Sequence, residues 1–356
     1  MQISGLARSN VDWDRHSEEP TVIAGSRLPD WERLVKLRIL SLASTCAFGV
    51  LDAPSPVCSQ YVSFIYSNLV YTTIDVPGST ETEAFGINNL GQVIGSYEMG
   101  SVGYNFIYSN GNYSTLNLSA PGASFTDAHG VNDLGQIVGT QIVGNPGNEL
   151  GFLYSNGNYS TLSVPGTLST EASGINNLGQ IVGFPGFLNS NGNYYTISFP
   201  GAFATFAAGI NDSGQIVGGF SAGTASDGFL YGNGNYTTLS VPGADSTDAM
   251  GINDLGQIVG VYNVGINEFP YAFGFLYSNG NYSTLSYPEA AYTAALGIND
   301  SGEIVGLANG VIPEPSTWVM MLTGFAGLGL ADCRRSRKGI GGERRGLINS
   351  TREARK

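Results

Sequence analysis

A ten-residue pattern occurs six times in this chain and limits its fold more than any other feature. The first copy, GINNLGQVIG, begins at Gly86, and the others begin at Gly130, Gly174, Gly209, Gly251 and Gly297. A second pattern, FLYSNGNYSTL from Phe152, has further copies from Phe64, Phe106, Phe187, Phe229 and Phe275. Successive copies of the first pattern are 44, 44, 35, 42 and 46 residues apart. This period is typical of a protein built from supersecondary repeats.

Both patterns predict β-hairpins. In the second pattern, Asn156-Gly157 lies between aromatic and β-branched residues, which is the signal of a two-residue primed turn. The first pattern reverses at Asn-Asn/Asp-Leu/Ser-Gly, as in a type I turn followed by a left-handed glycine. Two hairpins give four strands in about forty residues, the size of a propeller blade. Residues 60–311 are therefore predicted to form an all-β, six-bladed β-propeller of four-stranded repeats, each about 42 residues long.

The charges are unevenly distributed. All fifteen Lys and Arg lie at or before Arg38 or at or after Arg334, whereas residues 60–312 contain 17 Asp and Glu. Such a surface repels phosphate, which excludes nucleic acid and anionic lipid as partners of the central region. The absence of Lys there also excludes phosphate-binding Gly-Lys loops and Schiff-base chemistry. His129, the one His of the repeats, stands where other copies have apolar or small residues, which indicates packing rather than catalysis.

Residues 1–59 are predicted to be a targeting region, made of an upstream extension and a signal peptide. Lys36 and Arg38 precede an apolar run, 39–51, that is too short to span a membrane. Val57-Cys58-Ser59 then offers the small residues of a signal-peptidase site. The alternative is a disordered cytoplasmic tail. The three cysteines, Cys46, Cys58 and Cys333, all lie outside the repeats, so the mature domain is expected to use neither disulfides nor thiol chemistry.

The C-terminal region carries three features in a fixed order. Pro313-Glu314-Pro315 is followed by an apolar stretch, 319–331, and then by a cluster of Arg and Lys from Arg334 to Lys338. Residues 312–338 resemble the PEP-CTERM sorting signal. The resemblance implies transient membrane association through the C-terminal helix, and recognition and cleavage by an exosortase at the envelope of a Gram-negative bacterium. The alternative is a plain anchor that is not cleaved, and residues 339–356 are expected to be a disordered basic tail.

The repeats themselves resemble the extracellular HAF repeat family over Tyr61 to Ala308. The family's His-Ala-Phe is replaced by Gly-Phe, as at Gly151-Phe152, so a role for its His does not carry over. The resemblance implies an extracellular repeat protein and no particular reaction.

Four carboxylates recur six residues after the proline that links successive repeats: Glu83, Asp127, Glu171 and Asp248. If the Gly-Ile-Asn strand is innermost, they surround one mouth of the propeller channel. Without nearby Lys or Arg, these four carboxylates must stay hydrated, take up protons or bind a cation. The alternatives are therefore a solvated acidic rim or a site for a hard cation, with Ca²⁺ as the candidate cofactor. A second recurring set is replaced by Asn89 and Asn177 in two repeats, which indicates turn residues rather than ligands; it comprises Asp133, Asp212, Asp254 and Asp300.

Length variation is confined to one type of connection. The separation from the linking proline to the next decapeptide glycine is always nine residues, whereas that from the glycine to the next hairpin Phe is 20, 22, 13, 20 or 24. Both connections share one face of a propeller, where function is expected. The variable loops carry acids (Glu98, Glu149, Asp227, Glu268) and aromatics suited to carbohydrate stacking (Tyr97, Tyr104, Tyr262, Tyr271).

The sequence thus predicts an exported, non-catalytic interaction protein of the cell surface or exopolysaccharide matrix, which binds carbohydrate or a cation. Its partners are envelope polysaccharide or surface components, besides the exosortase. The alternative is a polysaccharide-active enzyme, a glycoside hydrolase or lyase, on a propeller scaffold, because two carboxylates suffice for that chemistry. The third hypothesis is a passive scaffold that binds neither carbohydrate nor a cation and catalyses no reaction.

The end signals make the first prediction. The exported chain should begin near Gln60 and end near Pro313-Glu314-Pro315, and it should resist trypsin even when unfolded, because residues 60–312 contain no Lys or Arg. Intact-mass measurement and terminal sequencing check this. A mature form that keeps Cys333 would contradict it.

Overall fold

The computed structural model describes residues 61–118, 122–144, 148–223, 225–265 and 271–309. The regular elements of these residues are 24 strands, β1 to β24. None of the described residues forms a helix long and apolar enough to cross a membrane. The signal-peptide and sorting-segment predictions, including Pro313, Glu314 and Pro315, lie outside the described residues.

Twenty of the strands, in sequence order, form five consecutive antiparallel blades. Blade 1 consists of β3 (Glu81–Ile87), β4 (Val93–Met99), β5 (Val102–Ser109) and β6 (Asn112–Leu116). Blade 2 consists of β7 (Ala123–Val131), β8 (Ile137–Val143), β9 (Asn148–Ser155) and β10 (Asn158–Leu162). Blade 3 consists of β11 (Glu171–Ile175), β12 (Ile181–Phe184), β13 (Phe187–Ser190) and β14 (Asn193–Thr196).

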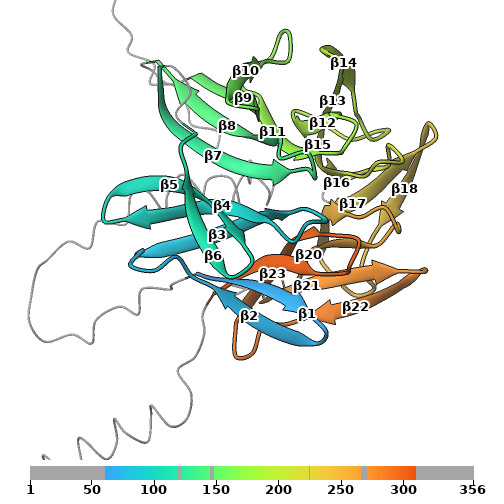
Figure 1. The fold of residues 1–356 in the computed structure, drawn as a ribbon. Helices are drawn as coiled ribbons and strands as arrows, with labels where there is room; N and C mark the ends of the chain where they lie inside the picture. The colour runs from blue at the N-terminus through green and yellow to red at the C-terminus, as the bar shows by residue number, and fades with distance from the viewer. Residues whose placement is uncertain (1–60, 119–121, 145–147, 224, 266–270, 310–356) are drawn as a thin grey trace, which may run out of the picture. The chain divides into compact units, whose positions relative to one another are not determined.

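Blades 4 and 5 repeat this order. Blade 4 consists of β15 (Ala204–Ile210), β16 (Ile216–Ala222), β17 (Ala225–Gly232) and β18 (Asn235–Leu239). Blade 5 consists of β19 (Ser246–Ile252), β20 (Ile258–Val264), β21 (Tyr271–Ser278) and β22 (Asn281–Leu285). In each blade the first strand is innermost, and the six innermost strands contact one another in cyclic order around a central axis (Figure 1).

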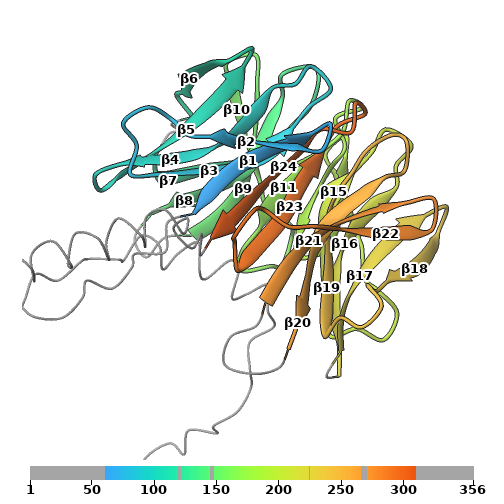
Figure 2. The same ribbon diagram turned by 90° about the horizontal axis from the view of Figure 1, so that it is seen from below.

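Blade 6 is assembled from both ends of the repeat region. It consists of β23 (Tyr292–Ile298), β24 (Ile304–Asn309), β1 (Val62–Ser67) and β2 (Val70–Ile74). Strand β1 pairs antiparallel with β24, with Val62 opposite Ala308 and Tyr66 opposite Ile304. Figure 2 shows the blue β1 beside the red-orange β24. The predicted six-bladed propeller of four-stranded repeats is confirmed.

The turns have the geometry that the sequence predicts. In the second pattern, Asn110 and Gly111 have φ of 50° and 80°, so both central residues are left-handed as a primed turn requires. In the first pattern, Gly91 has φ of 71° and its N–H donates to the carbonyl of Asn88 at 3.1 Å. These turns bring successive strands into antiparallel register without a longer loop.

Glycines allow the innermost strands to approach the axis. A Cβ on Gly86 would lie 2.6 Å from the carbonyl oxygen of His129 in blade 2, and the decapeptide glycine of every blade meets the next blade in the same way. A Cβ on Gly95 would lie 1.9 Å from the carbonyl oxygen of Glu83, where a bulge shifts the register of β3 and β4. Both glycine positions are therefore required by close backbone contact.

The hydrophobic core lies between adjacent blades. Each third strand contributes one Phe that is almost completely buried: Phe64, Phe106, Phe152, Phe187, Phe229 and Phe275. Phe106, for example, packs in one cluster with Ile74 and Val305 of blade 6. Replacing such a residue by Ala typically costs about 3–5 kcal/mol, so each interface between blades contributes substantially to the stability of the whole ring.

The pairing of β1 with β24 makes the second prediction. Deletion of residues 61–77 should lower the melting temperature of the whole domain in one cooperative transition, because it removes half of blade 6 and exposes the edge of β24. Differential scanning calorimetry of the secreted protein measures this. If the remaining blades melted unchanged, the ring would not be the cooperative unit.

Candidate functional site

The antiparallel strand order gives the ring two different faces. The decapeptide turns and the Asn-Gly hairpins lie on one face, called here the turn face. The loops between second and third strands, and the links between blades, lie on the opposite face, called here the connector face. The axis around which the innermost strands are arranged runs from one face to the other.

Six equivalent asparagines form a closed hydrogen-bonded ring at the turn-face mouth. They are Asn88, Asn132, Asn176, Asn211, Asn253 and Asn299, all buried. Each Nδ2 donates to the carbonyl oxygen of the equivalent Asn in the next blade at 3.0–3.2 Å, and Asn299 completes the ring by donating to Asn88. Each Oδ1 accepts the main-chain N–H of the residue four positions later at 2.9–3.0 Å. Each asparagine side chain therefore stabilises its own turn through Oδ1 and binds the next blade through Nδ2.

The next residue of each turn forms a second closed ring, made of Asn89, Asp133, Asn177, Asp212, Asp254 and Asp300. Each main-chain N–H donates to the side-chain Oδ1 of the equivalent residue in the next blade, at 2.7–2.8 Å. Asn and Asp both present an oxygen at this position, which explains their interchange between repeats. These are turn residues, as predicted, and they also join neighbouring blades, which sequence reasoning missed.

Charge is unevenly compensated around the second ring. Asp133 Oδ2 accepts hydrogen bonds from the amides of both Asn89 and Asn177, at 3.1 and 2.9 Å. Asp212, Asp254 and Asp300 follow one another as three consecutive carboxylates, of which Asp212 accepts one amide hydrogen bond at Oδ2, from Asn177 at 3.0 Å. Partial burial raises the pKa of Asp254, and the nearby Asp212, Asp300 and Asp133 raise it further, against the opposing effect of the Asp212 N–H. A pocket lined by both rings lies at this mouth.

The four carboxylates singled out in the sequence lie on innermost strands, in the half nearer the connector face. Glu83 is half-buried, whereas Asp127, Glu171 and Asp248 are buried. Asp248 Oδ1 lies 2.5 Å from the position that a Cβ on Gly219 of blade 4 would occupy, so its side chain packs between blades 4 and 5. A fully solvated rim therefore does not describe three of the four groups.

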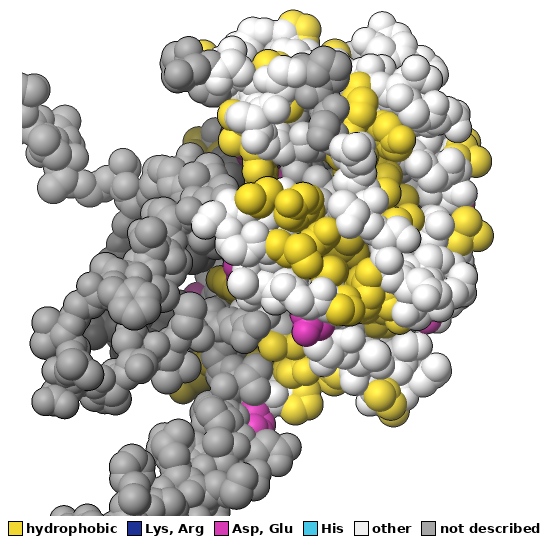
Figure 3. All heavy atoms as spheres, turned by 60° about the vertical axis from the view of Figure 1, so that its left-hand side comes forward, with side chains coloured by type: hydrophobic (Ala, Val, Ile, Leu, Met, Phe, Trp, Pro, Cys, Tyr) yellow, Lys and Arg dark blue, Asp and Glu magenta, His cyan; other side chains and the backbone are white. Residues whose placement is uncertain are grey.

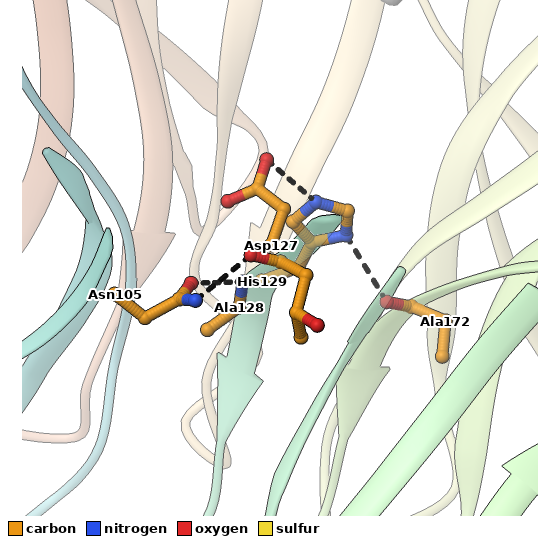
Figure 4. Close-up of polar contacts among 6 residues, drawn as sticks. Asn105, Asp127, Ala128, His129 and Ala172 are labelled. Atoms are coloured by element: carbon orange, nitrogen blue, oxygen red, sulfur yellow. Dashed lines mark hydrogen bonds and ion pairs between the residues drawn. The ribbon is translucent and has the colours of Figure 1, made fainter. Parts of the chain in front are cut away.

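Asp127 contacts the one His of the described residues (Figure 4). His129 Nε2 lies 3.5 Å from Asp127 Oδ2, and its Nδ1 lies 3.2 Å from the carbonyl oxygen of Ala172 in blade 3. The Asn105 amide bonds the backbone on both sides of Asp127, accepting from the Ala128 N–H at 2.9 Å and donating to the Thr126 carbonyl at 2.8 Å. His129 is the bulged residue of β7 and packs edge-on against Phe85 at 5.8 Å.

Two further carboxylates on the connector side, Glu149 and Glu81, have raised pKa values. Burial raises the pKa of Glu149 on β9, and the Glu171 carboxylate raises it further, while His129 opposes the shift. Burial and the facing Glu98 raise the pKa of Glu81. Across the described ranges, no group of three or more His, Cys, Asp or Glu is arranged to hold a metal ion. The Ca²⁺ hypothesis for Glu83, Asp127, Glu171 and Asp248 stays a prediction.

Comparison with solved structures identifies the architecture. The chain is similar to a TolB-like structure from Agrobacterium tumefaciens, with a TM-score of 0.51 and 12% identity over 71% of this chain and 99% of that one. The shared feature is a β-propeller. At this identity the likeness shows the fold alone. No protein-family model matches the chain, and no curated protein does.

The second ring makes the third prediction, about Asp254. Its raised pKa means that the folded protein gains stability as the carboxylate takes up a proton, and loses that contribution as pH rises through the folded-state pKa. Asp254→Asn should raise the free energy of unfolding at neutral pH by roughly 0.2–1 kcal/mol, the size of exposed charge interactions. The gain should shrink as pH falls, in denaturant titrations at several pH values.

Asp133→Asn is the matched control. It should lower the free energy of unfolding, because Asp133 already accepts two amide hydrogen bonds that an Asn cannot accept equally well. Equal effects of the two replacements would contradict this account of the ring.

The Ca²⁺ hypothesis makes the fourth prediction. A cation bound only by the folded protein adds about 2.7 kcal/mol at a hundredfold excess over Kd. Joint replacement of Glu83, Asp127, Glu171 and Asp248 by Asn or Gln should then abolish any Ca²⁺-induced rise in melting temperature. Joint replacement of the four aspartates of the second ring should leave that rise intact. Native protein that shows no rise at millimolar Ca²⁺ would refute the hypothesis.

Proposed function

We propose that this protein is an exported, non-catalytic interaction protein of the cell surface or exopolysaccharide matrix. The HAF-like repeats and the PEP-CTERM-like segment support export to the envelope of a Gram-negative bacterium, with an exosortase as the processing partner. Envelope polysaccharide is the partner of the mature domain. The proposed cellular location thus rests on the sequence, and the proposed binding role rests on the connector face.

One observation carries the proposed binding role: the connector face exposes large apolar side chains on a rigid ring. Leu168 is 99% exposed, Phe203 68% and Tyr271 58%, and they belong to loops or strand ends of different blades. Apolar side chains are exposed on the turn face as well, in its repeated turns: Leu69, Leu90, Leu134, Leu178 and Leu255. The connector face differs in exposing aromatic rings on loops and strand ends that vary between blades, which is typical of an interaction surface. The hydrogen-bonded rings on the opposite face hold the blades in place, so these loops can differ without altering the fold.

The charge of the domain restricts its partners further. Residues 60–312 have 17 carboxylates and no Lys or Arg. Figure 3 shows one face on which carboxylates and hydrophobic side chains are visible, with no Lys or Arg among the coloured residues. This composition disfavours polyanions, including nucleic acid, and is compatible with uncharged or cationic polymers.

A polysaccharide-active enzyme is the second candidate. The contact of Asp127 with His129, beside Glu149 and Glu171, places several acid–base groups close to one another. Such groups could transfer protons in hydrolysis or elimination. The non-catalytic role ranks first because Asp127 and Glu171 are buried between blades, where a polymer has little access.

The fifth prediction separates these candidates. The secreted protein should be retained by immobilised polysaccharide extracted from the producing cells, and it should release no new reducing or unsaturated ends from the soluble polymer. New ends would favour the enzyme, and Asp127→Asn should then abolish them. A protein that is neither retained nor active would be a passive scaffold, which would contradict the proposal.

A further inference from the structure

Blade 5 carries a ladder of three aromatic rings at its connector end. Tyr262 on β20 faces Phe273 on β21 in the strand register, with ring centroids 5.6 Å apart. Tyr271, two residues before Phe273, continues the row at 6.5 Å with its ring inclined by only 19°. The outer ring, Tyr271, is 58% exposed. The ladder therefore ends in a flat aromatic surface that is open to solvent.

Blade 1 has the same arrangement in a shorter form. Tyr97 on β4 and Tyr104 on β5 are cross-strand partners whose rings stack at 5.3 Å and 23°. Tyr97 is buried, whereas Tyr104 is 39% exposed. Tyr97 and Tyr262 occupy the same repeat position, two residues after the last decapeptide glycine. Each hydroxyl bonds a threonine of the outermost strand, at 2.8 Å to Thr115 and 2.9 Å to Thr284.

The propeller fold does not require an exposed aromatic pair at this position in every blade. In blade 2 the same position is Gln141, whose amide keeps the bond to the equivalent threonine, Thr161, at 3.3 Å. In blade 4 the position is Phe220, which is buried under Phe199 at 3.6 Å and offers no open ring. Blades 1 and 5 thus differ from blades 2 and 4 in carrying a cross-strand aromatic pair that continues into an exposed ring. Blade 4 also exposes an aromatic ring, Phe203, but it lies in the link before β15 and not on the second or third strand.

We propose that the Tyr97–Tyr104 stack and the Tyr262–Phe273–Tyr271 ladder are two binding platforms for uncharged polysaccharide. A planar ring with a free face packs against the C–H surface of a pyranose, while neighbouring hydroxyls bond its hydroxyl groups. A domain with 17 carboxylates and no Lys or Arg within residues 60–312 repels uronate, sulfate and phosphate groups, which selects neutral sugars. This inference rests on the proposed polysaccharide-binding function and names its ligand class and residues.

The two platforms are separated on the ring by blade 6 alone. A polymer that occupies one platform therefore has its neighbouring segments close to the other, which raises their effective concentration there. Loss of both platforms is expected to weaken binding more than the loss of either one.

The test uses affinity electrophoresis of the secreted protein in gels that contain hydroxyethylcellulose, dextran or polygalacturonate. At least one of the two neutral polymers should retard the native protein, and polygalacturonate should not. Tyr271→Ala and Tyr104→Ala should each weaken the retardation about 2- to 10-fold, and the double variant by more than 10-fold. Tyr271→Phe, which keeps the ring, should bind like the native protein.

Tyr195→Ala is the matched control, because Tyr195 is 55% exposed on β14 of blade 3, away from both platforms. It should bind like the native protein, and an unchanged melting temperature verifies that each variant is folded. The platforms would be refuted if both Ala variants bound normally, if the control lost as much, or if polygalacturonate bound best. Retention on native extracellular polysaccharide without dependence on Tyr104 or Tyr271 would overturn the platforms and leave the proposed function standing. Failure of native protein to bind any polymer would overturn both.

Discussion

The amide hydrogen bond from each ring asparagine to the carbonyl of the next blade sets the spacing of the six inner turns. These asparagines are buried, so a missing partner would leave a polar group unsatisfied at a cost of about 1–3 kcal/mol. Each residue also closes its own turn, which couples the shape of one turn to the position of the next. Because the last bond returns from Asn299 to Asn88, the set is complete only with all six blades present.

The two faces of the ring therefore have different roles: the turn face holds the blades together, and the connector face can vary in sequence and loop length. On the turn face, backbone contact at Gly86 and the two side-chain rings leave little freedom to vary. The hydrogen bonds of the turn face already fix the spacing of the blades. Loops on the connector face can therefore lengthen, and exposed aromatic side chains such as Tyr104 and Tyr271 can be added, without disturbing the core. The six buried phenylalanines between blades transmit this rigidity outwards, because each blade is packed against both of its neighbours.

Much of the fold could be predicted from the sequence, because each of the two patterns occurs six times and nearly every copy contains the same turn residues. The structure also joins the first hairpin to the last decapeptide, each of which lacks a partner within its own repeat. The asparagine ring did not follow, because a hydrogen bond across 44 residues leaves no local trace. Its one signal is that this Asn is identical in all six copies, although a turn alone would accept Asp or Ser.

The candidate sites were predictable only in part. Glu83, Asp127, Glu171 and Asp248 lie on innermost strands, but the burial of Asp248 depends on the space beside Gly219, which belongs to another repeat. Phe273 was not singled out, because its contact with Tyr262 depends on a cross-strand register that the sequence does not state.

The pairing of β1 with β24 also has a consequence for how the chain folds. Blades 1 to 5 use strands that are consecutive in sequence, so each can form as soon as its own residues are available. Blade 6 needs the first and the last strands together, and closing so long a loop is slow compared with forming a hairpin. During synthesis, the edge of β24 and the apolar face around Phe64 meet only at the end. An interrupted or truncated chain would therefore keep an unpaired strand edge, the feature by which incomplete β-proteins aggregate.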